Sequence, residues 1–190
     1  MKISFLVIVL NIQFVCFSQI PRGFLFAKSY SKEISLYKAK EYLVKYIFDS
    51  TKEPIKFQVR PIDAANSGEL TTLIYESKEQ FKSGLLLVFY GDYWNNSGVN
   101  YTGYGFKAIN KIVAINMLDK VLKVLEENKK DMDEDNDEFN ITYKESGLIF
   151  IIYRVWGASK IRVFFEGFDS EWDSKSVIKT LTALKAGKNK

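Results

Sequence analysis

The sequence contains no histidine, and its single cysteine, Cys16, lies close to the N-terminus. Catalysis by a serine or cysteine nucleophile with a histidine base is therefore excluded. Zinc sites built from cysteine and histidine are excluded for the same reason. A metal ion would have to be a hard cation held by oxygen atoms. We therefore expect no cofactor and no metal site, and we predict no catalytic residue.

A concentrated basic region is also absent. The chain has 27 lysine and arginine residues against 23 aspartate and glutamate residues, and the resulting charge of +4 is dispersed. Nucleic-acid binding usually requires a basic stripe, so no nucleic-acid partner is predicted. Aromatic residues, by contrast, make up 15% of the 190 residues. Because aromatic side chains favour strands, this composition indicates a sheet-rich fold.

The N-terminal stretch MKISFLVIVLNIQFVCFSQ has the layout of a secretory signal peptide. Lys2 precedes an apolar run that is shorter than the roughly 20 residues of a transmembrane helix. We predict a signal peptide over residues 1–18 and a single domain over residues 19–190, exported to the periplasm, the outer surface or the medium. An uncleaved anchor and lipidation of Cys16 remain open alternatives. No later segment reaches membrane-spanning length, so stable membrane insertion is not expected after the leader is removed.

The rest of the sequence predicts an α+β fold with three helices and about six to seven strands. Apolar residues at helical spacing predict helices over about residues 31–48, 117–130 and 174–186. Alternating or continuous apolar runs predict strands over 55–62, 69–77, 85–90, 101–115, 139–146, 147–156 and 160–168. We expect a mainly antiparallel sheet with all three helices packed on one face. The order of elements also suggests a duplicated α-β-β-β unit.

Three local signals refine this prediction. The run LLLVFY, residues 85–90, is typical of a central strand covered on both faces. Asn116 is predicted to cap the second helix, whose apolar stripe includes Leu118 and Val121. Asp173 is predicted to cap the last helix.

The acidic stretch KKDMDEDNDEFN partly resembles a calcium-binding loop. Asp131, Asp133 and Asp135 match the first three ligand positions of an EF-hand. Asn136 stands where glycine is required, and Thr142 stands where a bidentate glutamate is required. We therefore interpret residues 131–138 as a solvated connection between a helix and a strand, and weak cation binding by the clustered carboxylates is left open.

The segment YGDYWNNSGVNYTGYGF, residues 90–106, is the predicted binding surface. It combines flat aromatic rings with amide and carboxylate groups, which suit stacking and directional hydrogen bonds to a sugar or an extended peptide. The predicted ligand-binding residues are Tyr90, Asp92, Tyr93, Trp94, Asn95, Tyr101 and Tyr104. The structural alternative is a long hairpin loop whose aromatic residues fold back onto the sheet.

Two hypotheses of function follow. The first is an exported, non-enzymatic binding or interaction domain with an unknown protein or glycan partner. The second is a hydrolase that acts on carbohydrate with carboxylates alone, using Asp92, Glu166 or Asp169. The second requires two of these carboxyl groups to share a cleft. The sequence leaves the oligomeric state open.

Overall fold

The computed structural model describes residues 36–49, 54–65, 69–94, 97–130, 140–155 and 158–186, with the side chain of Trp94 excepted. The predicted signal peptide, Asn95 and the acidic stretch 131–138 lie outside the described residues. Within the described residues, no helix is both long and apolar enough to cross a membrane.

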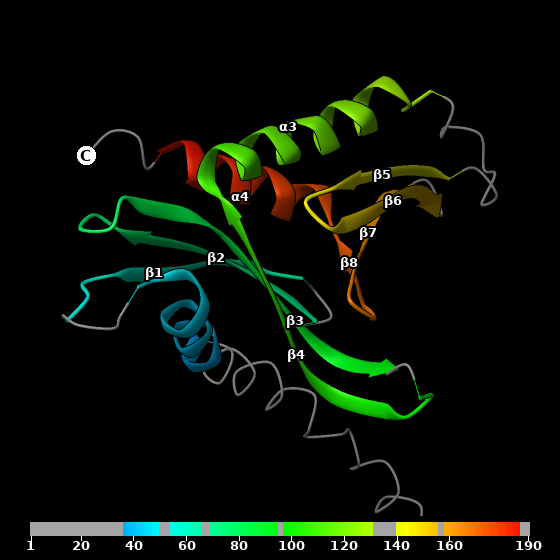
Figure 1. Cartoon of the computed structure of the whole chain (residues 1–190). Coiled ribbons are helices and arrows are strands. Elements are labelled where there is room, and N and C mark those ends of the chain that lie inside the picture. Colours follow the sequence, from blue (N-terminus) through cyan, green and yellow to red (C-terminus); the bar gives the residue numbers. More distant parts are fainter. Residues whose placement is uncertain are drawn as a thin grey trace, which may run out of the picture. The chain divides into compact units, whose positions relative to one another are not determined.

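The strands form two antiparallel four-stranded sheets, each a meander of consecutive hairpins (Figure 1). Sheet A contains β1 (Gln58–Ala64), β2 (Leu70–Ser77), β3 (Lys82–Trp94) and β4 (Asn100–Asn110). Sheet B contains β5 (Ile141–Glu145), β6 (Leu148–Val155), β7 (Ala158–Phe165) and β8 (Phe168–Trp172). The α+β class with antiparallel pairing is confirmed. The prediction of one sheet with six to seven strands is wrong, because the pairing divides into two sheets between β4 and β5.

A helix follows each sheet. These helices are α3 (Lys111–Glu127) after sheet A and α4 (Ser174–Ala186) after sheet B. A further helix, here called helix 36–47, precedes sheet A and consists of an α-helical part over residues 36–42 and a π-helical turn, η1 (Leu43–Ile47). The predicted α-β-β-β repeat is therefore wrong in its composition, since the recurring order in the described residues is four strands followed by a helix.

Sheet A is covered on both faces, as the run LLLVFY predicts. Leu85 and Leu87 of β3 belong to the cluster that includes residues of α3, α4 and sheet B. Leu86 and Val88, which point to the opposite face, belong to a second cluster with residues of helix 36–47. The prediction of three helices on one face is therefore wrong: helix 36–47 lies on one side of sheet A, and α3 and α4 lie on the other (Figure 1). A continuous apolar strand such as β3 needs cover on both of its faces.

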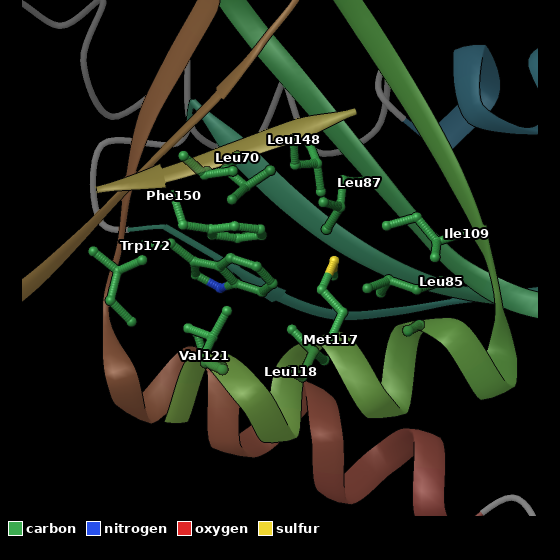
Figure 2. Close-up of a cluster of buried hydrophobic side chains, with 14 of the residues drawn as sticks. Leu70, Leu85, Leu87, Ile109, Met117, Leu118, Val121, Leu148, Phe150 and Trp172 are labelled. Carbon is green, nitrogen blue, oxygen red and sulfur yellow. The ribbon is translucent and has the colours of Figure 1, made fainter. Parts of the chain in front are cut away.

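The larger cluster is the main core of the described residues. Figure 2 shows Trp172 of β8 and Phe150 of β6 facing leucines of sheet A, with Val121 and Leu118 of α3 closing the cluster. Trp172 and Phe150 have no exposed surface. Burying a side chain of this size is worth roughly 1.5–3 kcal/mol or more, so this contact is a principal reason why sheet B packs onto sheet A.

Of the two predicted helix caps, one is wrong and the other is confirmed. The N-cap of α3 is Asn110, whose side chain accepts a hydrogen bond from the backbone N–H of Ile112 at 3.0 Å. The predicted cap at Asn116 is wrong. The β-branched residues Ile112 and Val113 favour a strand in the sequence, but in the structure they are exposed on the first turn of α3. Asp173 does cap α4, accepting from the backbone N–H of Ser176 at 2.9 Å.

A further strand, β8, was not predicted. It pairs with β7 through a two-residue turn in which Glu166 has φ 46° and Gly167 has φ 89°. Positive φ at both turn residues is typical of a type I′ hairpin turn, where Asn-Gly is the usual pair. Glutamate at the first turn position weakens this signal in the sequence.

Candidate functional site

The predicted binding residues lie on the long hairpin formed by β3 and β4. Tyr90 faces Tyr104 across the two strands, Tyr93 faces Tyr101, and Asp92 faces Thr102. The ring centroids are 4.8 Å apart in the first pair and 6.0 Å apart in the second. The segment is therefore mainly strand rather than loop, and it extends to Trp94 and from Asn100.

Alternation along the strands divides these residues between two faces. Tyr104 lies on the face of sheet A that packs against helix 36–47. Tyr93 lies on the opposite face and packs against the main core, with its ring centroid 4.6 Å from that of Phe168 in sheet B. Because successive side chains of a strand point to opposite faces, a single flat surface cannot contain both.

A groove of about 500 Å³ runs across the edge of β4 and brings the two faces together. One wall is helix 36–47, the floor is the β4 segment from Tyr104 to Phe106, and the other wall is the end of sheet B at the β7–β8 turn. The residues that line the groove are Lys38, Glu41, Tyr42, Lys45, Tyr46, Tyr93, Tyr104, Gly105, Phe106, Glu166 and Phe168.

The helical wall presents one continuous stripe of residues. Residues 38, 41, 42, 45 and 46 are spaced by three or four and therefore share one side of the helix. Ala39 and Leu43, on the adjoining side, are fully buried against sheet A and hold the helix in place. The groove stripe is thus the half of an amphipathic helix that the core leaves uncovered.

Charges on this stripe are organised around Glu41. Its carboxylate accepts hydrogen bonds from Lys45 at 2.7 Å and from Lys38 at 3.0 Å. These bonds, with the two positive charges, lower the pKa of Glu41 to about 2. The wall therefore carries one ionised carboxylate and two ammonium groups, a net positive charge at neutral pH.

Aromatic rings connect the helical wall to the floor. Tyr42 stacks on Phe106 with centroids 5.1 Å apart and planes 18° apart. Tyr46 lies 5.1 Å from Tyr42 on the outer side, and Tyr104 lies 6.0 Å from Phe106 along the strand. Tyr46 is 71% exposed, so its ring is available to a ligand without any rearrangement.

The opposite wall depends on a glycine in the floor. A Cβ atom at Gly105 would meet the ring of Phe168 at 2.7 Å, which is closer than real Cβ contacts allow. Glycine at this position therefore lets the end of sheet B approach β4. The approach places Glu166 on the rim, where its charge adds to the effect of burial in raising the pKa of Tyr42.

The other candidate carboxylates lie elsewhere. Asp92 is exposed and accepts a hydrogen bond from the hydroxyl of Thr102. Asp169 is paired with Arg162 across the outer face of sheet B. Among the described residues that line the groove, the carboxylates are Glu41 and Glu166.

A second hollow of about 460 Å³ lies beside the start of β1, the end of β2 and the turn that follows β2. It is lined by Ile55, Lys56, Phe57, Gln58, Glu76, Lys78 and Glu79. Lys56 and Glu79 are bonded to each other there, with Nζ and Oε1 3.4 Å apart. No group of three or more acidic, cysteine or histidine side chains suited to a metal ion occurs in the described part of the chain. The β4 groove is therefore the stronger candidate site.

Sequence analysis did not identify the helical half of this groove. The sequence predicts only that this half belongs to a helix over about residues 31–48. Its groove residues are Lys38, Glu41, Tyr42, Lys45 and Tyr46. The pair Tyr42 and Tyr46, four residues apart, could have indicated this surface. Two large aromatic side chains beside charged residues on one side of a helix are uncommon unless another part of the structure contacts them.

No protein-family model matches the chain, and no curated protein matches it at a significant level.

Proposed function

We propose that the chain is an exported, non-enzymatic binding domain that holds its ligand in the β4 groove. The single observation that carries this proposal is the groove itself, in which exposed or half-exposed aromatic rings stand beside ammonium and carboxylate groups. Binding sites commonly combine apolar and aromatic walls with a few polar groups that fix orientation. The export signal predicted from the sequence supports a role outside the cytoplasm.

Binding is favoured over carbohydrate hydrolysis by the state of the groove carboxylates. Glycoside hydrolysis requires a carboxylic acid that stays protonated near neutral pH to protonate the leaving group. Glu41 cannot fill that role, because its bonds to Lys38 and Lys45 lower its pKa to about 2. Of the three carboxylates proposed for the hydrolase, Asp92, Glu166 and Asp169, only Glu166 lines the groove among the described residues, whereas the reaction requires two of them to share a cleft.

Two tyrosines of the same helix provide the test. Tyr46 lines the groove and is 71% exposed, whereas Tyr37 is 73% exposed and is not among the described residues of the groove. Each should be changed to alanine, and both variants should be screened against arrays of oligosaccharides and of linear peptides. Because both side chains are exposed, each change should alter the free energy of unfolding by no more than about 0.5 kcal/mol.

The proposal predicts that Tyr46→Ala weakens binding to a captured ligand by about 2 kcal/mol, the loss expected for an aromatic hot spot. Tyr37→Ala should leave binding unchanged. Equal losses in both variants, or retained binding in Tyr46→Ala, would show that the ligand binds elsewhere. Turnover of an oligosaccharide on the array would instead support the hydrolase.

A further inference from the structure

We propose that the β4 groove binds an uncharged oligosaccharide, whose sugar rings stack on a row of aromatic side chains and whose hydroxyl groups bond to the paired charges of helix 36–47. This inference rests on the proposed binding function of the groove and names the class of its ligand. It is carried by the row of rings, by the balance of charge and by the hydrogen-bonding groups on the two walls.

The aromatic rings form a continuous row from helix 36–47 onto the β3–β4 hairpin. The ring centroid of Tyr42 lies 5.1 Å from that of Tyr46 and 5.1 Å from that of Phe106. The row continues along the strands, with 6.0 Å between Phe106 and Tyr104 and 4.8 Å between Tyr104 and Tyr90. Tyr46 and Tyr90 at its ends are exposed, and the rings between them are half-buried. A row of this length suits a ligand of several rings better than a monosaccharide.

Exposed rings beside charged groups favour a sugar over a purely apolar ligand. One face of a pyranose ring carries mainly C–H groups, which can pack on an aromatic face, while the hydroxyl groups at its edge remain free to make hydrogen bonds. An apolar ligand would remove water from the charged side chains that line the groove without replacing their hydrogen bonds, which costs free energy. A sugar replaces those bonds with its hydroxyl groups.

The formal charges that line the groove cancel. Lys38 and Lys45 are positive, and Glu41 and Glu166 are negative. Glu41 stays ionised at neutral pH, because the bonds from Lys45 and Lys38 lower its pKa to about 2. An anionic ligand would be attracted by the lysines and repelled by the carboxylates, and a cationic ligand would meet the reverse. Neither sign of charge gains on balance, so the groove suits an uncharged ligand.

The paired charges on the helix also retain hydrogen-bonding capacity for hydroxyl groups. Glu41 accepts from Lys45 at one carboxylate oxygen and from Lys38 at the other. A carboxylate has about four acceptor sites and an ammonium group has three donors, so both kinds of group remain available side by side. A hydroxyl both donates and accepts. Neighbouring hydroxyls of one sugar can therefore bond to an ammonium group and to the carboxylate together.

The opposite wall contributes a further acceptor at Glu166. Its charge adds to burial, the larger cause, in raising the pKa of Tyr42, so the carboxylate acts across the groove on the row of rings. Glu166 has φ 46° at a hairpin-turn position where asparagine or glycine is usual, so the turn itself does not account for a glutamate. A sugar between the two walls could donate to this carboxylate while it stacks on the row.

The experiment applies arrays of neutral oligosaccharides, uronate-containing oligosaccharides and linear peptides to the purified chain, followed by calorimetric titration of the ligand that binds. A neutral oligosaccharide should bind, with an affinity that changes little with salt because no net charge is neutralised. Tyr46→Ala should weaken this binding about thirtyfold through loss of a stacked ring. Tyr46→Phe keeps the ring and should stay within about twofold of the wild type, as should the control Tyr37→Ala.

Glu41→Gln tests the balance of charge. The change leaves the ammonium groups of Lys38 and Lys45 without their ionised partner. Affinity for the neutral oligosaccharide should fall about fivefold, in line with one hydrogen bond, and affinity for a uronate-containing one should rise. Glu127→Gln is the matched control, because it breaks an exposed pair with Lys123 on α3 and should change neither affinity.

Other results would overturn this inference in distinguishable ways. Binding of uronate-containing oligosaccharides alone, with an affinity that falls steeply with salt, would exclude the uncharged ligand. Equal losses in Tyr46→Phe and Tyr46→Ala would exclude stacking on the ring. A linear peptide whose binding is lost in Tyr46→Ala would keep the proposed function and remove the sugar. If no array yields a ligand sensitive to Tyr46→Ala, both the inference and the proposed function fail.

Discussion

The two edge strands of sheet A, β1 and β4, differ in proline content, in length and in the regularity of their register. On β1, Pro61 removes a backbone donor and a register shift bends the strand. Helix α4 contacts this edge and is joined to it by an ion pair between Lys179 and Asp63 at 3.0 Å. On β4, the register is regular and the outward side lies in a groove lined by aromatic and charged residues.

The difference teaches that protection of a sheet edge is local and is not a property of the fold as a whole. Both strands belong to one sheet, yet only β1 combines a proline with an irregular register. A long regular edge is an aggregation hazard unless its environment restricts what can reach it. Helix 36–47 and the β7–β8 turn line the groove beside β4 and restrict what can reach it.

The largest expected effect separates the inward and outward groups of β4. Lys107→Pro removes an N–H that faces β3 and should lower the free energy of unfolding by about 2–4 kcal/mol through a lost ladder bond and an unpaired carbonyl. Ala108→Pro, at the next position, removes an outward N–H and should cost less than about 1 kcal/mol. Chemical denaturation measures the free energy of unfolding of each variant, and the two losses are compared. Equal losses would show that the backbone alternation assigned to β4 is incorrect.

A second prediction concerns the wall that sheet B forms beside β4. Gly105→Ala places a Cβ atom against the ring of Phe168, where the available distance is 2.7 Å. Relieving this overlap should cost about 1–3 kcal/mol of stability and move the β7–β8 turn outward. Gly91→Ala is the matched control, because a Cβ at that position of β3 meets nothing within 4 Å. Unfolding curves that coincide for the two variants would contradict the tight contact.

A third prediction weakens the closed edge. Lys179→Met removes the ion pair with Asp63, and because the lysine side chain is 59% exposed the loss should be no more than about 1 kcal/mol. Burial, the largest single cause, favours the neutral form of Asp63. The hydrogen bonds from Lys179, Ser176 and the backbone of Ala64, together with the charge of Lys179, outweigh it, and the pKa of Asp63 is lowered. The contribution is thus present above the unfolded pKa near 4 and is lost as the pH falls through the lower folded value.

Denaturation at neutral pH and again below the folded pKa of Asp63 tests this assignment. The difference between the wild type and Lys179→Met should shrink at low pH, where Asp63 is protonated in both states. A difference that is the same at both pH values would show that Lys179 acts through packing of its alkyl chain instead.

The smallest expected effect is electrostatic and lies across the groove. Glu166 contributes to the raised pKa of Tyr42, after burial as the larger cause. Glu166→Gln should therefore lower the pKa of Tyr42 while leaving it above the ordinary value near 10. Titration of ring-labelled tyrosine by NMR measures this shift. Glu171→Gln is the control, since Glu171 is paired with Lys160 and should not affect the pKa of Tyr42. A pKa of Tyr42 that changes in the control and not in Glu166→Gln would place Glu166 away from the groove.

The sequence by itself determined the class of the fold and most of its elements. Alternation along β1, the continuous apolar runs in β3 and β6, and the cap at Asp173 are local signals, because they depend on neighbours within a few residues. The absence of histidine, and of any cysteine beyond Cys16, also excluded whole classes of chemistry without reference to the structure.

The tertiary structure decided how the strands divide into two sheets and where the groove lies. No local pattern shows that pairing stops between β4 and β5, since both flanking strands have ordinary strand sequences. Tyr42 and Phe106 are far apart in the sequence and meet only because helix 36–47 packs on the face of sheet A that carries Phe106. The groove likewise depends on Gly105 allowing Phe168 to approach. Such contacts arise from packing between distant segments, which residue spacing along the chain does not encode.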